Sequence, residues 1–355
     1  MKTSACLEVG RADFRDRTRM ITEDVHPAGP GEVVFVVERF GLTANNLTYA
    51  VLGDALDYWA VFPAEPGWGR IPAWACLRAA DDSVPGVEAG SRFFGLSPMA
   101  THVVLRPGRV RPTGFTEQSD YRARVPAVYN GYVRIAAGPD GPGVPGDDIS
   151  LVLRPVFWLS FTLDRYLARS APGRPVIVTS ASSKAAIGLA RLLSARGVAV
   201  TGLTSERNRE FVRSLGPYTS VRTYDRLGQA MGAGAVLIDI AGSASLRASI
   251  RAQAAGRLAE VIVAGAASGE AATGADHLFF APDHIWQLTA ELGWLRLEQQ
   301  FEAELAGFIA ASPWLALVRH EGPAGIAEGF RQVLDQAGSP ADAHLVVPHP
   351  AAAAG

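Results

Sequence analysis

The chain has 355 residues, of which 48% are hydrophobic and 19% are charged. This length exceeds what one hydrophobic core usually serves, so we expect two domains. The formal net charge is −2 and there is no long basic run, which argues against a nucleic-acid-binding surface. The two distant cysteines, Cys6 and Cys76, indicate a reducing compartment. The sequence shows neither a signal peptide nor a bilayer-spanning apolar stretch, so we expect a cytoplasmic protein without membrane partners.

Short strand-like segments separated by Pro and Gly dominate the first part of the chain. They are residues 31–40, 70–77, 91–96 and 102–106. A polar stretch with little periodicity, residues 41–54, follows the first of them. These features predict a small β-rich domain over residues 1–150. Near its end, residues 138–148 (GPDGPGVPGDD) are too rich in turn residues for regular structure.

Strands and helices alternate in the next part of the chain. The strand-like segments are residues 175–179, 198–204, 235–240 and 261–264. The helical segments are residues 159–167, 185–195, 208–215 and 245–258. This rhythm predicts an α/β domain with a parallel, doubly wound sheet, which we assign to residues 151–285.

The last part of the chain is expected to return to the first domain, from about residue 286 to residue 355. Residues 285–308 have the composition of one long helix, and residues 314–336 that of a strand followed by a helix. The end, residues 346–355 (VVPHPAAAAG), has little to pack and is expected to be frayed.

A turn of small polar residues joins the first strand of the parallel sheet to its helix. A buried strand, a tight turn and a helix N-terminus together form an anion site, because free N–H groups and the helix dipole point at the ligand. The turn, residues 179–188 (TSASSKAAIG), lacks the G-x-G-x-x-G pattern, since only Gly188 is present. The residues that we assign to phosphate binding are Ser180, Ala181, Ser182, Ser183 and Lys184. The alternative is an ordinary turn in which Ser182 or Ser183 caps the helix.

The end of the second strand indicates which nucleotide would bind. An acid near this point serves the ribose hydroxyls of NAD, whereas a basic residue accommodates the 2′-phosphate of NADP. Here Ser205 is followed by Arg207 and Arg209, while Glu206 could serve NAD. We therefore favour NADPH, bound by Ser205 and Arg207. The alternative is a solvated start of a helix.

Three further residues are assigned to the cofactor site. Asp239 and Gly265 follow later strands, and ligands of open α/β sheets gather at the carboxyl ends of strands. Ser160 lies in the segment that enters the domain. Turn chemistry is the alternative explanation for the residues at the strand ends.

Four segments together resemble a known family. They are GEVVFVVERFGLTANNLTYAVLGD, SRFFGLSPMATHVVLRPGRV, RPVFWLSFTLDRYL and PVIVTSASSKAAIGLARLLSARGVAVTGLTSERN. The chain resembles the zinc-free medium-chain dehydrogenases/reductases, which include quinone oxidoreductases and enoyl reductases. The S-A-S-S-K loop resembles that of an uncharacterised branch. The resemblance implies a GroES-like β-rich domain, a Rossmann domain and a possible homodimer.

The resemblance also implies the chemistry. Asn46 stands where zinc-dependent members carry a Cys, and no His-Glu pair follows in residues 60–80, so we expect no metal. The candidate catalytic residues are Asn46, Tyr49, Tyr129 and Asn130, with a tyrosine hydroxyl delivering a proton. The alternative is that the tyrosines are packed with one satisfied hydrogen bond each and that the asparagines serve turns. Relatives carry an Asp where this chain has Tyr49, so their detailed mechanism does not transfer directly.

The resemblance implies an NADPH-dependent, zinc-free reductase of an activated C=C bond or of a quinone-like small molecule. The altered loop leaves two alternatives open. One is a non-redox enzyme, such as a lyase, isomerase or cyclase, and the other is a nucleotide-binding protein without turnover.

Overall fold

The computed structural model describes residues 3–135, 148–226, 233–266 and 276–349. Most of the loop expected at 138–148 therefore lies outside the described residues. The chain divides into two compact units: unit 1 is Met1–Val152 with Trp314–Gly355, and unit 2 is Leu153–Pro313. The chain returns to unit 1 at Trp314, and not from about residue 286 as the sequence suggested.

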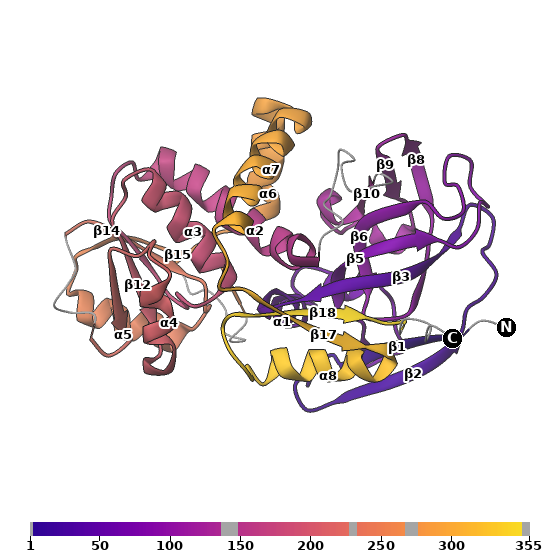
Figure 1. The fold of residues 1–355 in the computed structure, drawn as a ribbon, viewed down its shortest axis with the longest axis horizontal. Coiled ribbons are helices and arrows are strands. Elements are labelled where there is room, and N and C mark those ends of the chain that lie inside the picture. The colour runs from indigo at the N-terminus through magenta and orange to yellow at the C-terminus, as the bar shows by residue number, and fades with distance from the viewer. Residues whose placement is uncertain (1–2, 136–147, 227–232, 267–275, 350–355) are drawn as a thin grey trace. The chain divides into compact units, whose positions relative to one another are not determined.

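Unit 1 is rich in strands (Figure 1). A small antiparallel sheet has the order β2-β1-β4. A larger sheet has the order β17-β18-β3-β5-β6-β10-β9-β8, with β7 also paired to β3. Their bounds are β1 Thr3–Gly10, β2 Thr18–Asp24, β3 Val33–Leu42, β4 Trp68–Gly69, β5 Pro72–Ala79, β6 Arg92–Pro98, β7 His102–Leu105, β8 Pro107–Arg111, β9 Gly114–Glu117, β10 Gly131–Ile135, β17 Ala316–Glu321 and β18 Asp342–Val347.

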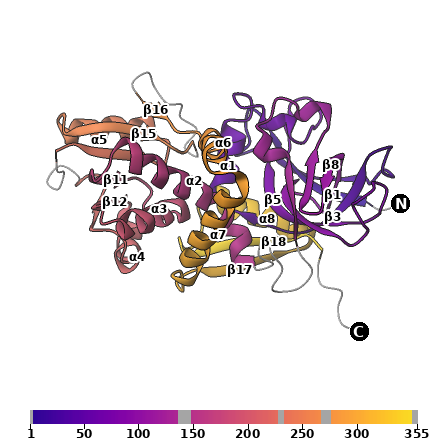
Figure 2. The same ribbon diagram turned by 90° about the horizontal axis from the view of Figure 1, so that it is seen from above.

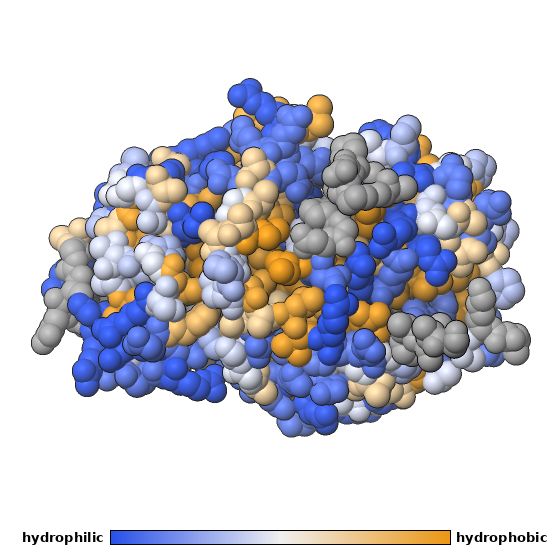
Figure 3. Space-filling view, viewed as in Figure 1, coloured by the Kyte–Doolittle hydropathy of each residue, from blue (hydrophilic) through white to orange (hydrophobic). Residues whose placement is uncertain are grey.

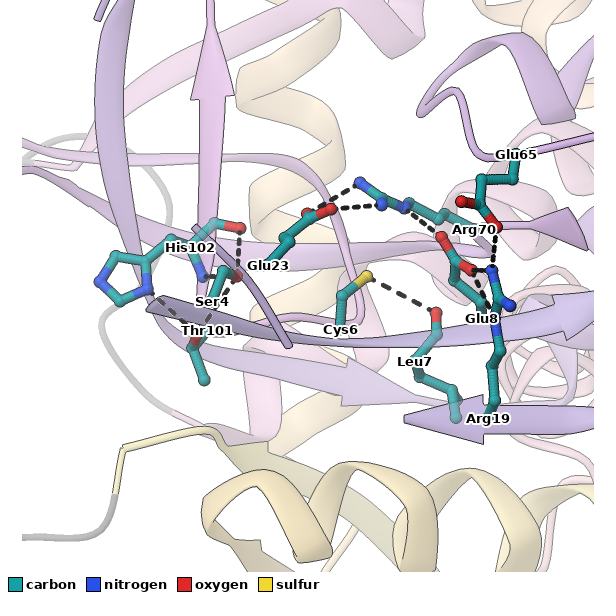
Figure 4. A network of polar contacts seen from close by, with 10 residues as sticks. All are labelled: Ser4, Cys6, Leu7, Glu8, Arg19, Glu23, Glu65, Arg70, Thr101 and His102. Atoms are coloured by element: carbon teal, nitrogen blue, oxygen red, sulfur yellow. Dashed lines mark hydrogen bonds and ion pairs between the residues drawn. The ribbon is translucent and has the colours of Figure 1, made fainter. Parts of the chain in front are cut away.

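The buried carboxylate of Glu8 joins the segments of the small sheet. Arg19 of β2 donates to Glu8 Oε2 from Nε and Nη2 at 2.9 and 2.6 Å, and Arg70 donates to Oε1 at 3.0 Å (Figure 4). Arg70 also binds Glu23 of β2. Burial raises the pKa of nearby Cys6 to about 12, so its thiol keeps its proton at neutral pH. The two arginines offset the cost of burying Glu8, which is 1% exposed.

Helix α1 (Ala44–Val51) lies in the polar stretch that shows little periodicity. Thr43 and Asn46 form a capping box at its start: Asn46 Oδ1 accepts from the N–H of Thr43 at 2.9 Å, and the Thr43 hydroxyl accepts from the first turn. An Asn in place of the usual Glu or Gln conceals this signature in the sequence.

The C-terminal segment completes the larger sheet. Strand β17 and helix α8 (Gly322–Leu334) lead to β18, which runs parallel to β17 and antiparallel to β3. The expectation that residues 346–355 are frayed is wrong for their first two positions. Val346 is fully buried and pairs with Phe40, because β18 fills the place between β3 and β17.

Unit 2 contains the parallel sheet that the sequence predicts. Its strands run in the order β13-β12-β11-β14-β15-β16, and every neighbouring pair is parallel. Their bounds are β11 Val176–Val178, β12 Val200–Thr204, β13 Ser220–Thr223, β14 Ala235–Asp239, β15 Leu258–Val263 and β16 His277–Leu278. The described α-helices of the unit are α2 Asp148–Ser170, whose residues up to Val152 belong to unit 1, α3 Lys184–Ala195, α4 Arg209–Ser214, α5 Ala244–Ala254, α6 Ala281–Leu292 and α7 Trp294–Ala310.

Helices cover both faces of this sheet, as in a doubly wound fold (Figures 1 and 2). One face packs against α2 and α3 through residues such as Leu163 and Leu189. The other packs against α5 through Ile250. Val176 and Val178 pack into the first of these cores, and Ile177 packs into the second. Because both faces of β11 are buried, the strand is apolar throughout.

The long helix expected over 285–308 is two helices. Gly293 ends α6 and begins α7 with a φ of +76°, a conformation that glycine adopts without a Cβ clash. Helix α7 stays in unit 2 because its aromatic face packs on α2. The rings of Trp158 and Phe301 stack with centroids 3.8 Å apart, and those of Phe157 and Phe308 at 5.2 Å. This packing places the return to unit 1 after α7.

Among the helices of the described residues, none combines the length and the apolar character needed to span a bilayer.

We expect the thermal stability of unit 1 to fall as the pH drops below the usual His pKa of about 6.5. His320 on β17 and His344 on β18 are buried, with His320 Nε2 3.1 Å from His344 Nδ1. Burial lowers the pKa of His320, although Glu328 on α8 opposes the shift. Stability from the neutral ring is therefore present above this pH and is lost as the pH falls through the lowered pKa.

The measurement is the melting temperature of wild type and His320→Gln between about pH 7 and pH 5. The variant should lose less stability than wild type over this interval. Equal losses would contradict the assignment to His320, because the carboxylates that titrate at lower pH are common to both proteins.

Candidate functional site

The order of the strands in unit 2 reverses between β11 and β14. Loops that follow two adjacent strands diverge there, which creates the crevice where open α/β sheets bind their ligands. Most predicted cofactor residues follow strands at this carboxyl edge. Residues 180–184 follow β11, Ser205 and Arg207 follow β12, Asp239 ends β14, and Gly265 follows β15. Ser160 is the exception, because it lies on α2.

The turn after β11 is held by contacts to neighbouring strands. Ser180 has a φ of +49°, and its N–H donates to the Tyr224 hydroxyl at 3.2 Å. Ala181 is fully buried; its N–H donates to Leu203 O at 2.9 Å, and its carbonyl accepts from the Tyr218 hydroxyl at 2.7 Å. These contacts fix the path of the turn but occupy backbone groups that a phosphate could otherwise use.

The start of α3 combines a serine cap with a lysine. Ser183 is the N-cap, and its hydroxyl accepts from the N–H of Ala186 at 3.3 Å, as the alternative interpretation of the turn requires. Asn208 donates to the Ser182 hydroxyl at 3.1 Å, which links this turn to the segment after β12. Lys184 is the first residue of α3, at the positive end of the helix dipole.

Ser160 has a structural contact rather than a place at the carboxyl edge. Its hydroxyl is fully buried and donates to Ala185 O at 2.7 Å. A Cβ added at Gly188 would lie 2.8 Å from Ser160 Oγ, closer than real Cβ contacts allow. Gly188 is therefore needed for the close approach of α2 and α3.

Hydrophilic side chains gather over α4 and the turn before it (Figure 3). The exposed charged residues there are Glu206, Arg207, Glu210 and Arg213. Glu206 is paired with Arg209 at 3.1 Å. Arg207 is exposed and has no ion-pair partner among the residues that the structure describes. The acid that could serve NAD is thus engaged, while the arginine beside Ser205 remains available to an anion.

The Asp239 carboxylate is engaged by hydrogen bonds and an ion pair inside unit 2. Its Oδ1 accepts from the Thr179 hydroxyl at 2.8 Å and from the N–H of Gly242 at 3.0 Å, and its Oδ2 accepts from Arg247 Nη1 at 2.8 Å. Arg247 also binds Asp276 at 3.1 Å. The side chains of Arg247 and of the two aspartates are each at most 1% exposed. Both carboxylate oxygens of Asp239 therefore organise the loop, and neither is left for a cofactor.

Gly265 permits a close backbone contact. A Cβ at this position would lie 2.0 Å from Ile240 O, and one at Gly242 would lie 2.2 Å from Gly265 O. Gly242 has a φ of +69°, which favours glycine as well. The loops after β14 and β15 touch through these two glycines, as the turn-chemistry alternative for Gly265 expected.

Two of the four predicted catalytic residues meet in unit 1. The rings of Tyr49 and Tyr129 lie 6.1 Å apart, with Tyr58 packed against both. The hydroxyls of Tyr58 and Tyr129 are 3.0 Å apart, and Trp74 Nε1 donates to the Tyr49 hydroxyl at 3.0 Å. Burial raises the pKa of all three tyrosines, so each keeps its proton at neutral pH.

The two asparagines have different surroundings. Both polar atoms of the Asn46 amide are engaged, because Oδ1 caps α1 and Nδ2 donates to Pro72 O at 2.9 Å. Asn130 donates to Arg122 O at 3.4 Å, whereas its buried Oδ1 has no hydrogen-bond partner within the described part of the chain. Asn46 thus has a structural task that the sequence did not reveal.

Several residues that shape these sites were not identified from the sequence. They are Tyr58, Tyr218, Tyr224, Arg247 and Asp276. Each acts through a contact with a distant element, and no motif or spacing marks it. Only Arg247, eight positions after Asp239 on α5, lies close enough in sequence for a link to be suspected.

Two cavities of unit 2, of about 290 and 430 Å³, have no candidate residue in their lining. The smaller lies along α2 and α6 beside Tyr166 and His284, and the larger beside α3 and α7. Within the described ranges, no group of three or more His, Cys, Asp or Glu side chains is arranged to hold a metal ion.

A family model described as "Protein of unknown function (DUF2855)" matches residues 40–339. No curated protein matches the sequence.

Solved structures share the fold over nearly the whole chain. The mycobacterial protein Rv1454c complexed with NADPH has a TM-score of 0.59 and 16% identity, with 97% of this chain and 100% of that chain covered. The quinone oxidoreductase of Pseudomonas syringae pv. Tomato DC3000 has a TM-score of 0.59 and 14% identity, with 97% and 100% covered. A cobalt- and zinc-bound alcohol dehydrogenase from Pyrobaculum aerophilum has a TM-score of 0.56 and 16% identity, with 98% and 100% covered. These likenesses confirm the predicted fold class, a β-rich domain together with a domain built on a parallel, doubly wound sheet.

Replacing Asp239 should destabilise unit 2 strongly, because Asp239→Ala leaves the buried Arg247 without one of its two carboxylates. We expect a loss of about 3 to 5 kcal/mol in the free energy of unfolding, measured by urea titration. The matched control is Glu206→Ala, which breaks an exposed pair and should cost at most about 1 kcal/mol. Similar losses in the two variants would refute the structural role of Asp239.

Proposed function

Because the chain belongs to a family whose own description is a protein of unknown function (DUF2855), we propose its activity from the site itself. We propose an NADPH-dependent, zinc-free reductase of an activated C=C bond or a quinone-like small molecule. The observation that carries this proposal is the arrangement at the carboxyl edge of unit 2. There, a small-residue turn leads into α3 beside Arg207, an exposed arginine without an ion-pair partner among the described side chains. The fold shared with Rv1454c, which was solved with NADPH, supports it.

The residues at this edge fit the pyrophosphate of a dinucleotide. No side chain from Ser180 to Ser183 is larger than a serine, so a ligand can approach the backbone closely. Lys184 begins α3, so its charge adds to the positive end of the helix dipole. Both would attract a phosphate, which could also accept hydrogen bonds from the serine hydroxyls.

The segment after β12 supports NADPH rather than NADH. Arg207 can bind the 2′-phosphate with charge-assisted hydrogen bonds, and Ser205 can add a hydroxyl donor. Glu206, which would repel a phosphate, is neutralised by Arg209. The net balance of charge at this point therefore favours the phosphorylated cofactor.

When bound, NADPH would supply the hydride. The chain's own residues would orient the substrate and provide a proton. Of the four catalytic candidates, Tyr129 is the one that we propose for the proton, because its hydroxyl keeps its proton at neutral pH and contacts that of Tyr58. Tyr49 and Asn130 would line the site beside it. Asn46 would contribute by placing α1, which carries Tyr49, and it supports the proposed absence of zinc because an amide is a poor zinc ligand.

A non-redox enzyme is the second candidate, and one observation favours it. The N–H groups of Ser180, Ala181 and Ser183 already donate to Tyr224, Leu203 and Ser180, so the turn offers fewer donors than a glycine-rich loop. A lyase or isomerase on this fold would turn its substrate over without any nicotinamide.

Titration with NADPH and NADH, followed by nicotinamide fluorescence, tests the cofactor. Wild type should bind NADPH more tightly than NADH. Arg207→Gln should weaken NADPH by about tenfold to a hundredfold through loss of charge-assisted bonds, and should leave NADH unchanged. The matched control is Arg213→Gln, an exposed arginine on α4, which should change neither.

If wild type binds neither nucleotide, the reductase proposal fails and the non-redox enzyme becomes the leading candidate. If Arg207→Gln weakens both nucleotides equally, the proposed contact to the 2′-phosphate is wrong.

Removing the Tyr129 hydroxyl should slow turnover without weakening cofactor binding. With the best substrate from a panel of enones, enoyl thioesters and quinones, Tyr129→Phe should lower kcat by about a hundredfold or more, because the proton donor is lost. The NADPH dissociation constant should be unchanged. Tyr121→Phe, at a tyrosine that is 43% exposed, is the control and should retain full kcat. Full kcat in Tyr129→Phe would exclude Tyr129 as the donor.

A further inference from the structure

Ser180 has a backbone conformation that its side chain disfavours. It lies two residues after the end of β11, at the tight turn where the dinucleotide fingerprint places its first glycine. Its φ of +49° lies in the left-handed region, which glycine enters freely and a residue with a Cβ enters at a cost in free energy. Such a conformation persists only when surrounding contacts impose it.

Tyr224 supplies a contact that favours this conformation. Its hydroxyl accepts from the Ser180 N–H at 3.2 Å. Burial raises the pKa of Tyr224, and hydrogen bonds from both the backbone and the side chain of Ser180 oppose that rise. In addition, the Ser180 carbonyl accepts from the N–H of Ser183 at 2.8 Å, which closes the turn onto α3.

Tyr224 is itself firmly held. Its ring packs in the core beneath α5 with Ile177, Leu203 and Leu237. Its backbone carbonyl accepts from Gln253 Nε2 of α5 at 3.0 Å. Because its ring is packed in the core and its backbone is anchored to α5, Tyr224 holds its hydroxyl at one position. The hydroxyl can therefore impose a conformation on the turn at Ser180.

We propose that Tyr224 is a positioning residue that replaces the first glycine of a dinucleotide loop, by holding Ser180 in the left-handed conformation that directs the turn onto α3. This inference rests on the proposed function, since it assigns the positioning to the nucleotide site. If it is right, the Tyr224 hydroxyl should no longer be needed for nucleotide binding once Ser180 is replaced by glycine.

The experiment is a double-mutant cycle with Tyr224→Phe and Ser180→Gly, read by the NADPH dissociation constant. Tyr224→Phe alone should weaken NADPH by about tenfold, because the turn relaxes away from the left-handed conformation. Ser180→Gly also removes a hydroxyl from the proposed phosphate site, so the reference for the double variant is Ser180→Gly itself and not wild type. The double variant should bind within about twofold of Ser180→Gly, because glycine adopts the left-handed conformation without the Tyr224 hydroxyl.

Tyr218 provides the matched control on the same turn. Its hydroxyl donates to Ala181 O at 2.7 Å, a contact that does not involve the conformation of Ser180. Any loss in Tyr218→Phe should therefore persist when Ser180→Gly is added. Rescue of Tyr218→Phe by the glycine, or failure of the glycine to rescue Tyr224→Phe, would overturn the proposal.

A readout without nucleotide separates this inference from the proposed function. The melting temperature should fall more when Tyr224→Phe is made in wild type than when it is made in the Ser180→Gly variant, since only serine needs the support. If wild type does not bind NADPH but this difference is found, the proposed function fails while Tyr224 still positions the turn. Equal falls in the two backgrounds would refute the positioning, whatever the nucleotide affinity.

Discussion

The Asp239 carboxylate, enclosed between the Thr179 hydroxyl and the Arg247 guanidinium, connects the ends of β11 and β14 with the segment before β16. Charges this deeply buried are tolerated only when each is paired, so the loops at the carboxyl edge have essentially one arrangement that satisfies them. Thr179 directly precedes the turn that leads into α3, and its hydroxyl also accepts from the N–H groups of Ile240 and Ala241. The geometry of the candidate nucleotide site thus depends on a buried ion pair that lies inside the unit.

Local pattern was enough to predict the central strands of the parallel sheet of unit 2, although not its edge strands β13 and β16 or the placement of α6 and α7. A strand such as β11, buried on both faces, must be apolar throughout, and an amphipathic helix such as α3 must repeat its apolar residues at helical spacing. Both signals are written into short stretches of sequence. Pairing over long distances leaves no such signal, which is why the pairing of β18 with β3 was missed. Helix α1 was missed for a different reason, since an unusual capping residue conceals its start.

The residues of the candidate site were predicted only in part, because contacts between distant segments leave no local signal in the sequence. The sequence indicates which loops meet at the carboxyl edge, because topology determines it. It does not indicate which side chains are already occupied. Ser160 and Asp239 have polar groups that could bind a cofactor, but Ser160 donates to Ala185 O and Asp239 is paired with Arg247. Tyr224 shows the converse, because an unremarkable core tyrosine by sequence contacts the backbone of the turn.

The position of β18 also bears on how the chain is made. This strand lies between β3 and β17, so the Phe40–Leu42 end of β3 lacks its partner strand until residues 342–347 have left the ribosome. Unit 2 is continuous in sequence and is complete earlier. Unit 1 can therefore complete its sheet only after all of unit 2 has been made, and until then the unpaired end of β3 is an exposed strand edge.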